Sequence, residues 1–416
     1  MHDINKTDLG KLDAMCDRYL KQWLKIPKSG TLAAVHSPKF LNIKSITDIY
    51  RESRSIAYAT SRVKADNAVK TALDCKLNHE QRWKRKFSIT VYAENAYTDA
   101  ATSVQDNVPI PPGSKYLEKV KDKIKSNIKQ ETNRYWANHV KNLVVQGRFL
   151  DLLYEENNNI TWQSIIYNLP QGILQFITNA SIDTLPTNAN LKRWGKRNNA
   201  KCSQCSSHET LHHVLSHCEP KLDRYRWRHD NILHFLVHIL KKLAELENKM
   251  DMVKIYADLP SMSANGTTIP ANIAQTSQIP DLVILQENKI TVIELTVPFE
   301  LNIVHSHQRK CDKYAGLISD ITSSGYEVYF YAIEIGCRGY IDKENEGRIK
   351  TIFRSISSKF KWCEIKALLS KLAILGSFTI YNSRHEHNWC TPVILKPNIE
   401  FSRLVRNVDQ LQPKCM

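Results

Sequence analysis

Two adjoining apolar segments decide the fold, residues 279–285 (IPDLVIL) and residues 290–297 (ITVIELTV). β-Branched residues dominate both segments, and the polar residues 287–289 (ENK) separate them, so the pair predicts two strands joined by a short turn. If residues 287 and 288 alone form the loop, Asp281 lies directly opposite Glu294 on one sheet face. Two buried carboxylates repel each other unless a divalent cation lies between them, so the hairpin favours a catalytic magnesium site. In the alternative interpretation, one acid caps a turn and the other faces solvent.

A second pattern is a C-x2-C-x7-H-x4-C array formed by Cys202, Cys205, His213 and Cys218. Thiolates and an imidazole at this spacing suit tetrahedral zinc, so the array predicts a structural zinc knuckle. The alternative is a set of unpaired thiols in a histidine-rich loop. Within the same stretch, the sequence leaves three further histidines open as ligands, His208, His212 and His217.

Basic and aromatic residues bracket the knuckle. Those before it are Lys192, Arg193, Trp194, Lys196 and Arg197, and those after it are Arg224, Arg226, Trp227, Arg228 and His229. Cationic side chains neutralise phosphates and aromatic rings stack on bases, so both groups are predicted to bind nucleic acid. The alternative is a solvated charged face.

The composition agrees with a polyanionic partner. The 416 residues carry 58 Lys and Arg against 42 Asp and Glu, a formal charge of +16, and 42% of them are hydrophobic, enough for several domains with cores. No run of eighteen apolar residues and no charged-then-apolar leader is present, which argues against a membrane or secreted protein. Ten cysteines suit a reducing compartment, so we expect a nuclear or cytoplasmic location.

Apolar periodicity predicts the remaining elements. Helices are expected over residues 9–25, 231–247 and 302–321, helical regions over 45–77 and 115–148, and further strands over 253–257 and 326–333. Residues 106–114 form a linker by their Pro and Gly content. The 115–148 stretch carries nine Lys or Arg against three acids, which fits either a solvated helix face or a track for a phosphate backbone.

The order helix, three strands, helix, strand is the core of the restriction-endonuclease-like, or PD-(D/E)XK, fold. The lysine of that motif is expected two residues after the second acid, where this chain has Thr296. A cation must therefore come from elsewhere, and Lys310 and Lys313 on the next helix are the candidates. Tyr314 lies one turn beyond Lys310.

Together these motifs resemble a known family. The P-D dipeptide, E-L-T-x-P-F-E over 294–300 and K-x2-K-Y over 310–314, with the knuckle before them, look like the C-terminal part of site-specific non-LTR retrotransposon proteins that carry a restriction-like endonuclease. Residues 23–27 (WLKIP) and 32–38 (LAAVHSP) resemble the start of the thumb in those proteins, and residues 228–230 (RHD) resemble a basic tripeptide between knuckle and nuclease.

The resemblance implies a multi-domain chain of α and α/β parts. Its expected divisions are a thumb-like helical region over 1–105, a basic helical linker over 106–200, the CCHC knuckle over 201–229, the nuclease core over 230–345 and a helical extension over 346–416. It also implies that Asp281 and Glu294 bind magnesium. We expect the Leu295 carbonyl as a further ligand, Lys313 as the lysine that positions the water, and Lys310 and Tyr314 on the substrate.

The resemblance further implies a metal-dependent endonuclease that nicks target DNA, with that DNA and the element RNA as partners. The sequence contains no Asp-Asp pair, so the aromatic-x-Asp-Asp strand of the polymerase palm is missing. We therefore expect no reverse transcriptase activity and a separate polymerase-bearing protein as a partner. Two alternatives stay open: a nucleic-acid-binding module with an inactive nuclease fold, and a decayed, 5′-truncated element copy.

Overall fold

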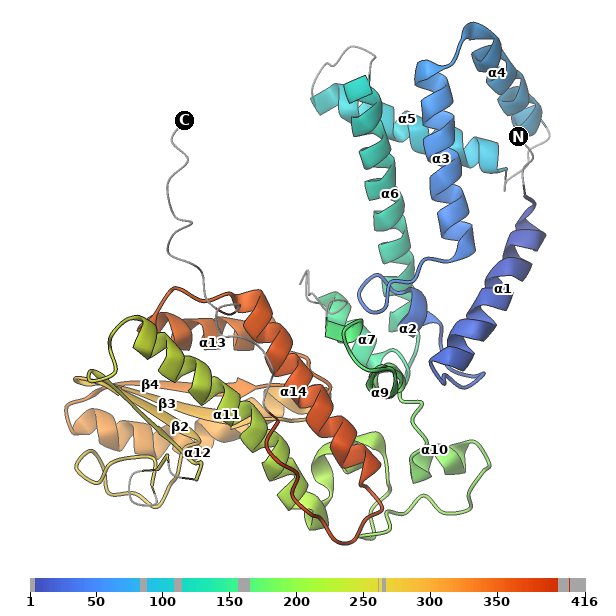
Figure 1. Ribbon diagram of the computed structural model, residues 1–416. Helices are drawn as coiled ribbons and strands as arrows, with labels where there is room; N and C mark the ends of the chain where they lie inside the picture. The colour runs from blue at the N-terminus through green and yellow to red at the C-terminus, as the bar shows by residue number, and fades with distance from the viewer. Residues whose placement is uncertain are drawn as a thin grey trace, which may run out of the picture. The chain divides into compact units, whose positions relative to one another are not determined.

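The computed structural model describes residues 4–82, 88–107, 114–155, 165–260, 262–263, 267–395 and 404. The chain divides into two compact units, residues 1–155 and 156–416. The first is helical, and the second combines helices with a mixed sheet (Figure 1).

The first unit is built from α1 (Lys6–Trp23), α2 (Ala33–His36), α3 (Ile46–Lys64), α4 (Asn67–Arg82), α5 (Ile89–Asn107), α6 (Ser114–Lys141) and α7 (Arg148–Glu155). Helices α3, α5 and α6 share a core that includes Ala59, Ala100 and Val120. The helical region expected over 45–77 contains two helices, α3 and α4. They are separate because Ala65 is extended and the Asp66 carboxylate accepts a hydrogen bond from the Val69 amide, which starts α4.

The predicted boundary at residue 105 does not separate two units. Residues 108–113 of the expected linker lie outside the described residues, but α5 and α6 on either side of them pack in one core. The basic helical stretch therefore belongs to the first unit, and the division falls at residue 155. Apolar positions on α6 such as Leu117 and Ile124 explain this, because they fill the space between α3 and α5.

The second unit begins with short helical segments and then forms the sheet. Its elements are α9 (Gln171–Ser181), α10 (Asn188–Arg193), the π-helical turn η1 (His213–His217), η2 (Glu219–Lys221), α11 (Leu222–Leu246), β1 (Val253–Ala257), β2 (Leu282–Gln286), β3 (Lys289–Thr296), η3 (Glu300–Asn302), α12 (Ile303–Ser323), β4 (Glu327–Glu334), α13 (Lys343–Ile356) and α14 (Trp362–Asn382). The expected order of helix, three strands, helix and strand is confirmed.

The sheet has the order β1-β2-β3-β4, with β1, β2 and β3 antiparallel and β4 parallel to β3. Gln286 pairs with Lys289, so residues 287 and 288 alone form the loop, and Glu287 adopts a left-handed conformation (φ 50°) there. Leu282 pairs with Ile293, which leaves Asp281 opposite Glu294, one residue beyond the paired strands. The predicted hairpin register is therefore confirmed.

Helices cover both faces of the sheet (Figure 1). On one face, α12 packs Tyr314 and Leu317 against Val283 and Val292. On the other face, α11, α13 and α14 bury a larger apolar core. Helices α13 and α14 thus complete the same core as the sheet, although the sequence suggested a separate extension from residue 346. None of the helices that the structure describes is long and apolar enough to cross a membrane.

Candidate functional site

The paired acids lie where β2 begins and β3 ends. Side chains alternate along a strand, so Glu294 faces α12 together with Val292. The Leu295 amide donates a hydrogen bond to Asp281 Oδ2 at 2.7 Å, and the Asp281 amide donates to Glu294 Oε2 at 3.3 Å. Only 3% of Glu294 is exposed. Burial and then the charge of Asp281 raise the pKa of Glu294, whereas Lys310 lowers it.

A divalent cation would fit this donor set. Carboxylate oxygens are the preferred ligands of magnesium, and a cation between two converging acids removes their repulsion. Thr296, in the place of the motif lysine, lies two residues beyond Glu294 on the same strand face, and its hydroxyl oxygen is buried without a hydrogen-bond partner among the described residues. The three side chains therefore bring oxygen atoms to the end of the β2–β3 hairpin where Asp281 and Glu294 lie opposite each other.

Lys310 supplies the cation that Thr296 does not. Its Nζ donates a hydrogen bond to Glu294 Oε1 and forms an ion pair with it. Lys313 is exposed, and its Nζ donates to the Tyr314 hydroxyl at 2.9 Å. Of the two candidate lysines, Lys310 therefore contacts Glu294, whereas Lys313 contacts its neighbour Tyr314.

Tyr314 is a core residue here, which corrects its expected position on the substrate. It is fully buried, and its ring packs against Phe330 with the centroids 5.7 Å apart. Its hydroxyl donates to the Ile279 carbonyl at 3.2 Å. Burial, with the nearby charge of Glu294, raises its pKa. The phenol thus fixes the residues that precede Asp281, and it is closed to a phosphate.

His229 is a member of this site that the sequence placed elsewhere. Its Nε2 lies 3.2 Å from Asp281 Oδ2, and its Nδ1 lies 3.0 Å from Asp230 Oδ1. Burial would lower the pKa of His229, but the carboxylates of Asp281 and Asp230 outweigh burial and raise it to about 10. The imidazole therefore orients the Asp281 carboxylate. Local sequence patterns do not predict this contact, because the two residues are 52 positions apart.

The four knuckle residues converge on one point. Their ligand atoms all lie within 4.8 Å of one another, with Cys202 Sγ 3.9 Å from Cys218 Sγ and Cys205 Sγ 3.3 Å from His213 Nε2. Tetrahedral zinc with bonds of about 2.3 Å to sulfur places two sulfurs about 3.8 Å apart. The cluster can therefore bind a metal such as zinc, and the rival histidines are not part of it.

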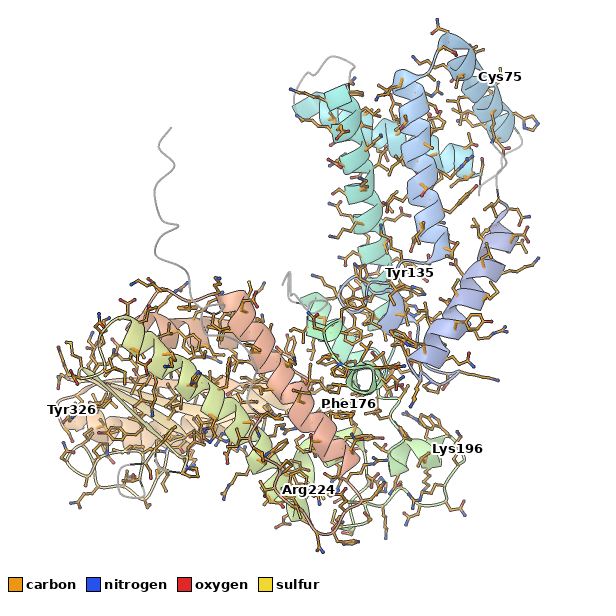
Figure 2. The ribbon with its side chains drawn as sticks, viewed as in Figure 1. Cys75, Tyr135, Phe176, Lys196, Arg224 and Tyr326 are labelled. Atoms are coloured by element: carbon orange, nitrogen blue, oxygen red, sulfur yellow. The ribbon has the colours of Figure 1, made fainter. Side chains whose placement is uncertain are left out.

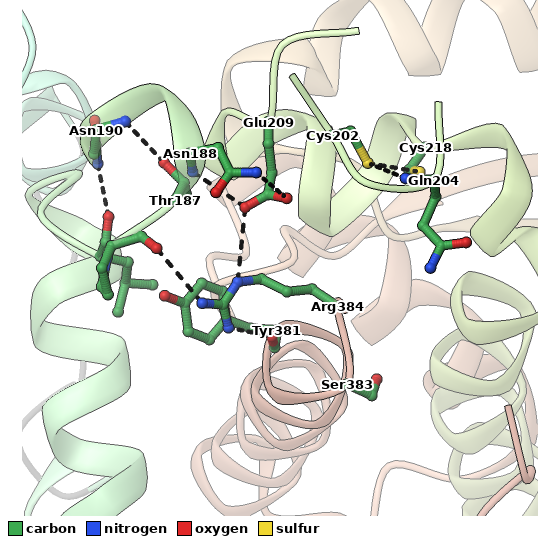
Figure 3. A network of polar contacts seen from close by, with 12 residues as sticks. Thr187, Asn188, Asn190, Cys202, Gln204, Glu209, Cys218, Tyr381, Ser383 and Arg384 are labelled. Atoms are coloured by element: carbon green, nitrogen blue, oxygen red, sulfur yellow. Dashed lines mark hydrogen bonds and ion pairs between the residues drawn. The ribbon is translucent and has the colours of Figure 1, made fainter. Parts of the chain in front are cut away.

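The polar surroundings of the knuckle hold it against the rest of the second unit (Figure 3). Glu209 is fully buried; it accepts hydrogen bonds from Asn188 and lies 3.8 Å from the Arg384 guanidinium beyond α14. Gln204 Nε2 donates a hydrogen bond to the Glu386 carbonyl at 3.1 Å. The knuckle is thus packed into the fold from both sides and is not an independent finger.

The basic residues around the knuckle fall into two sets. Exposed are Lys192, Arg193, Lys196, Arg197 and Arg226, with Trp194 half-buried. Figure 2 labels Lys196 on the loop after α10 and Arg224 in the first turn of α11. Arg224, Trp227 and Arg228 are buried, with at most 4% of each side chain exposed, so their expected contacts with nucleic acid are corrected.

The buried set is structural because each of its side chains donates at least one hydrogen bond to the protein. Arg224 donates to the Glu386 carbonyl at 2.7 Å, and Trp227 to the Pro392 carbonyl at 2.9 Å. Arg228 donates to the Val297 carbonyl at 3.0 Å and to the Ser377 hydroxyl at 2.9 Å. Gly376 leaves room for it, since a Cβ there would lie 2.5 Å from Arg228 Cγ. The helical period of α11 explains the error, since it turns these three side chains inward.

The acid at the end of the P-F-E tripeptide is also structural. Glu300 is buried and pairs with Arg338 at 2.7 Å, and the Arg338 guanidinium lies over the Phe299 ring at 4.2 Å from its centroid. This pair fixes the turn that follows β3, and it leaves Asp281 and Glu294 as the acids of the candidate site.

No protein-family model and no curated protein matches this sequence.

Proposed function

We propose that the chain is a metal-dependent DNA endonuclease with a restriction-endonuclease-like core, part of a non-LTR retrotransposon protein. The observation that carries the proposal is the opposition of Asp281 and Glu294 across the β2–β3 hairpin, with Lys310 paired to Glu294. The order of strands and helices agrees with that fold, and the P-D dipeptide, residues 294–300 and residues 310–314, which resemble the family, supply Asp281, Glu294 and Lys310.

In this proposal, Asp281, Glu294 and the Leu295 carbonyl would hold magnesium, which would polarise a phosphate and lower the pKa of a bound water. The Leu295 amide and His229 both contact Asp281 Oδ2 and orient that carboxylate. Lys310 forms an ion pair with Glu294, and on this contact we assign the role of the motif lysine to Lys310 instead of Lys313. Lys313 then steadies the Tyr314 hydroxyl.

The knuckle and the exposed basic residues beside it bind the nucleic acid in this proposal. Lys192, Arg193, Lys196 and Arg197 are exposed within six positions of one another, and Trp194 stands among them with Lys196 Nζ 6.0 Å from the centre of its ring. Exposed cations with an aromatic ring suit a phosphate backbone with unstacked bases. Target DNA and element RNA are the proposed ligands.

Nicking of a supercoiled plasmid by the zinc-loaded chain tests the enzymatic part. We expect nicked circles with magnesium, none with a chelator in its place, and a loss of at least about a hundredfold for Glu294→Gln, because the change removes a charged ligand without altering shape. Nicking that is equal in Glu294→Gln and the unchanged chain would refute the role of this acid.

A second function is favoured by the same exposed surface. The basic residues and the zinc ligands do not depend on Asp281, so the chain can bind nucleic acid without cleaving it. Undiminished DNA binding without any nicking would support this binding module over the endonuclease.

A further inference from the structure

The knuckle contacts both elements that carry the acid site. One contact runs through α11, which bears His229, and the other runs through the connection from β3 to α12, which joins Glu294 to Lys310.

The first contact passes through Tyr225. The amide of the ligand residue Cys218 donates to the Tyr225 hydroxyl at 3.0 Å, and that hydroxyl donates to the carbonyls of His213 and Val214 at 3.1 and 3.0 Å. Tyr225 lies one turn before His229 on the same helix. The position of the zinc ligands therefore sets the start of α11, and with it the imidazole that contacts Asp281.

The second contact passes through His212, the neighbour of the ligand His213. Its Nε2 accepts a hydrogen bond from Asn302 Nδ2 at 3.1 Å, and its ring packs on Phe299 with the centroids 5.0 Å apart. Phe299 lies five residues after Glu294, and Asn302 is the residue before α12. The ring thus holds the connection that sets the start of α12, and Lys310 is eight residues further along.

We propose that the metal-loaded knuckle positions the acid site, with His212 as the positioning residue that joins them. The inference rests on the proposed function for the identity of the acid site. His212 is not a ligand of the knuckle metal, so its effect on the acids is separable from metal loading. A small displacement at His212 can reach the acids because the elements between them are rigid and closely packed.

The test measures manganese binding to the zinc-loaded full chain by electron paramagnetic resonance, with Asp281→Asn as the baseline for other manganese sites. We expect His212→Ala to keep its zinc and to bind manganese about three- to tenfold more weakly. His212→Gln restores an acceptor for Asn302 and should recover part of that loss. His208→Ala is the matched control, because His208 is exposed in the same loop.

Equal manganese affinity in His212→Ala and His208→Ala, with zinc retained in both, would overturn the inference. Hydrogen exchange gives a second measurement that does not need activity. His212→Ala should speed exchange of the amides over 299–306 while leaving β1 protected, and unchanged exchange over 299–306 would also overturn it. Failure of the proposed function is distinguishable, because it appears as absent nicking in the unchanged chain.

Discussion

His229 lies 3.2 Å from Asp281 and joins α11 to the residue that precedes β2. The sequence suggested a nucleic-acid contact for this histidine, but the structure turns its ring to a carboxylate. If Asp281 binds a metal as we propose, His229 should affect metal affinity more than affinity for DNA.

The first prediction follows from this contact. His229→Ala should weaken manganese binding about 10- to 100-fold, because carboxylates that bind metals depend on the hydrogen bonds that orient them. DNA affinity and its dependence on salt should stay the same. Calorimetric titration with manganese and filter binding of DNA check the two parts. A weaker dependence of DNA affinity on salt, with unchanged manganese affinity, would indicate instead that His229 contacts DNA.

The second prediction concerns the knuckle metal. The chain should bind one equivalent of zinc, and a Cys205→Ser, Cys218→Ser double variant should lose it, because two of four ligands are removed. Cys390→Ser is the control, since that thiol is exposed and outside the cluster. Metal analysis of the purified chains decides the matter, and zinc retained by the double variant would contradict the site.

The third prediction locates the nucleic-acid surface. Changing Lys192, Arg193 and Lys196 to Gln should reduce the slope of log affinity against log salt by about two to three units. The matched variant changes Lys115, Lys119 and Lys125, which are exposed on α6, to Gln. A flatter slope in the α6 variant alone would move the binding surface to the first unit.

The fourth prediction concerns pH and the place of α14 in the fold. Burial opposes the charge on Glu346, but Lys350 and Lys366 outweigh burial and lower its pKa below 4.5. A carboxylate with a lowered folded pKa stabilises the protein above its unfolded pKa, and this stabilisation is lost as the pH falls through the folded value. Since Lys366 is on α14, Glu346→Gln should lower the stability of the second unit at pH 7.

The same substitution should cost less at pH 3 than at pH 7, because the unchanged chain loses the charge of Glu346 as the pH falls through the folded pKa. Urea unfolding at pH 7 and pH 3 measures both values. Glu364→Gln, an exposed acid in the first turn of α14, is the control. An equal effect of Glu346→Gln at both pH values would contradict the ion pair.

The sequence predicted the local features well, because their causes are local. The β-branched runs and the short polar break set the β2–β3 register, and the cysteine spacing marked the metal cluster. The contacts of His229 with Asp281, of Arg228 with Val297 and of His212 with Asn302 needed tertiary packing, since the residues of each pair lie more than 50 positions apart. The contact of Lys310 with Glu294 was not predictable for a related reason: helical spacing gives the direction of a side chain but not how far its tip reaches.

The two lysines provide the fifth prediction. Lys310→Ala should reduce nicking by about a hundredfold, because it removes the charge beside Glu294. Lys313→Ala should reduce it less, since Lys313 contacts the buried Tyr314 hydroxyl. Single-turnover nicking rates at saturating DNA separate the two. The reverse order of effects would restore Lys313 as the lysine that acts on the water.

The most direct measurement compares magnesium-dependent plasmid nicking by the zinc-loaded chain with nicking by Asp281→Asn and Asp258→Asn. Asp258 is an exposed acid whose amide donates to the Asp281 carbonyl at 2.9 Å, so it controls for loss of one nearby carboxylate. The account predicts nicking by the unchanged chain and by Asp258→Asn, and a loss of at least about a hundredfold for Asp281→Asn alone. Equal nicking by all three chains would contradict it.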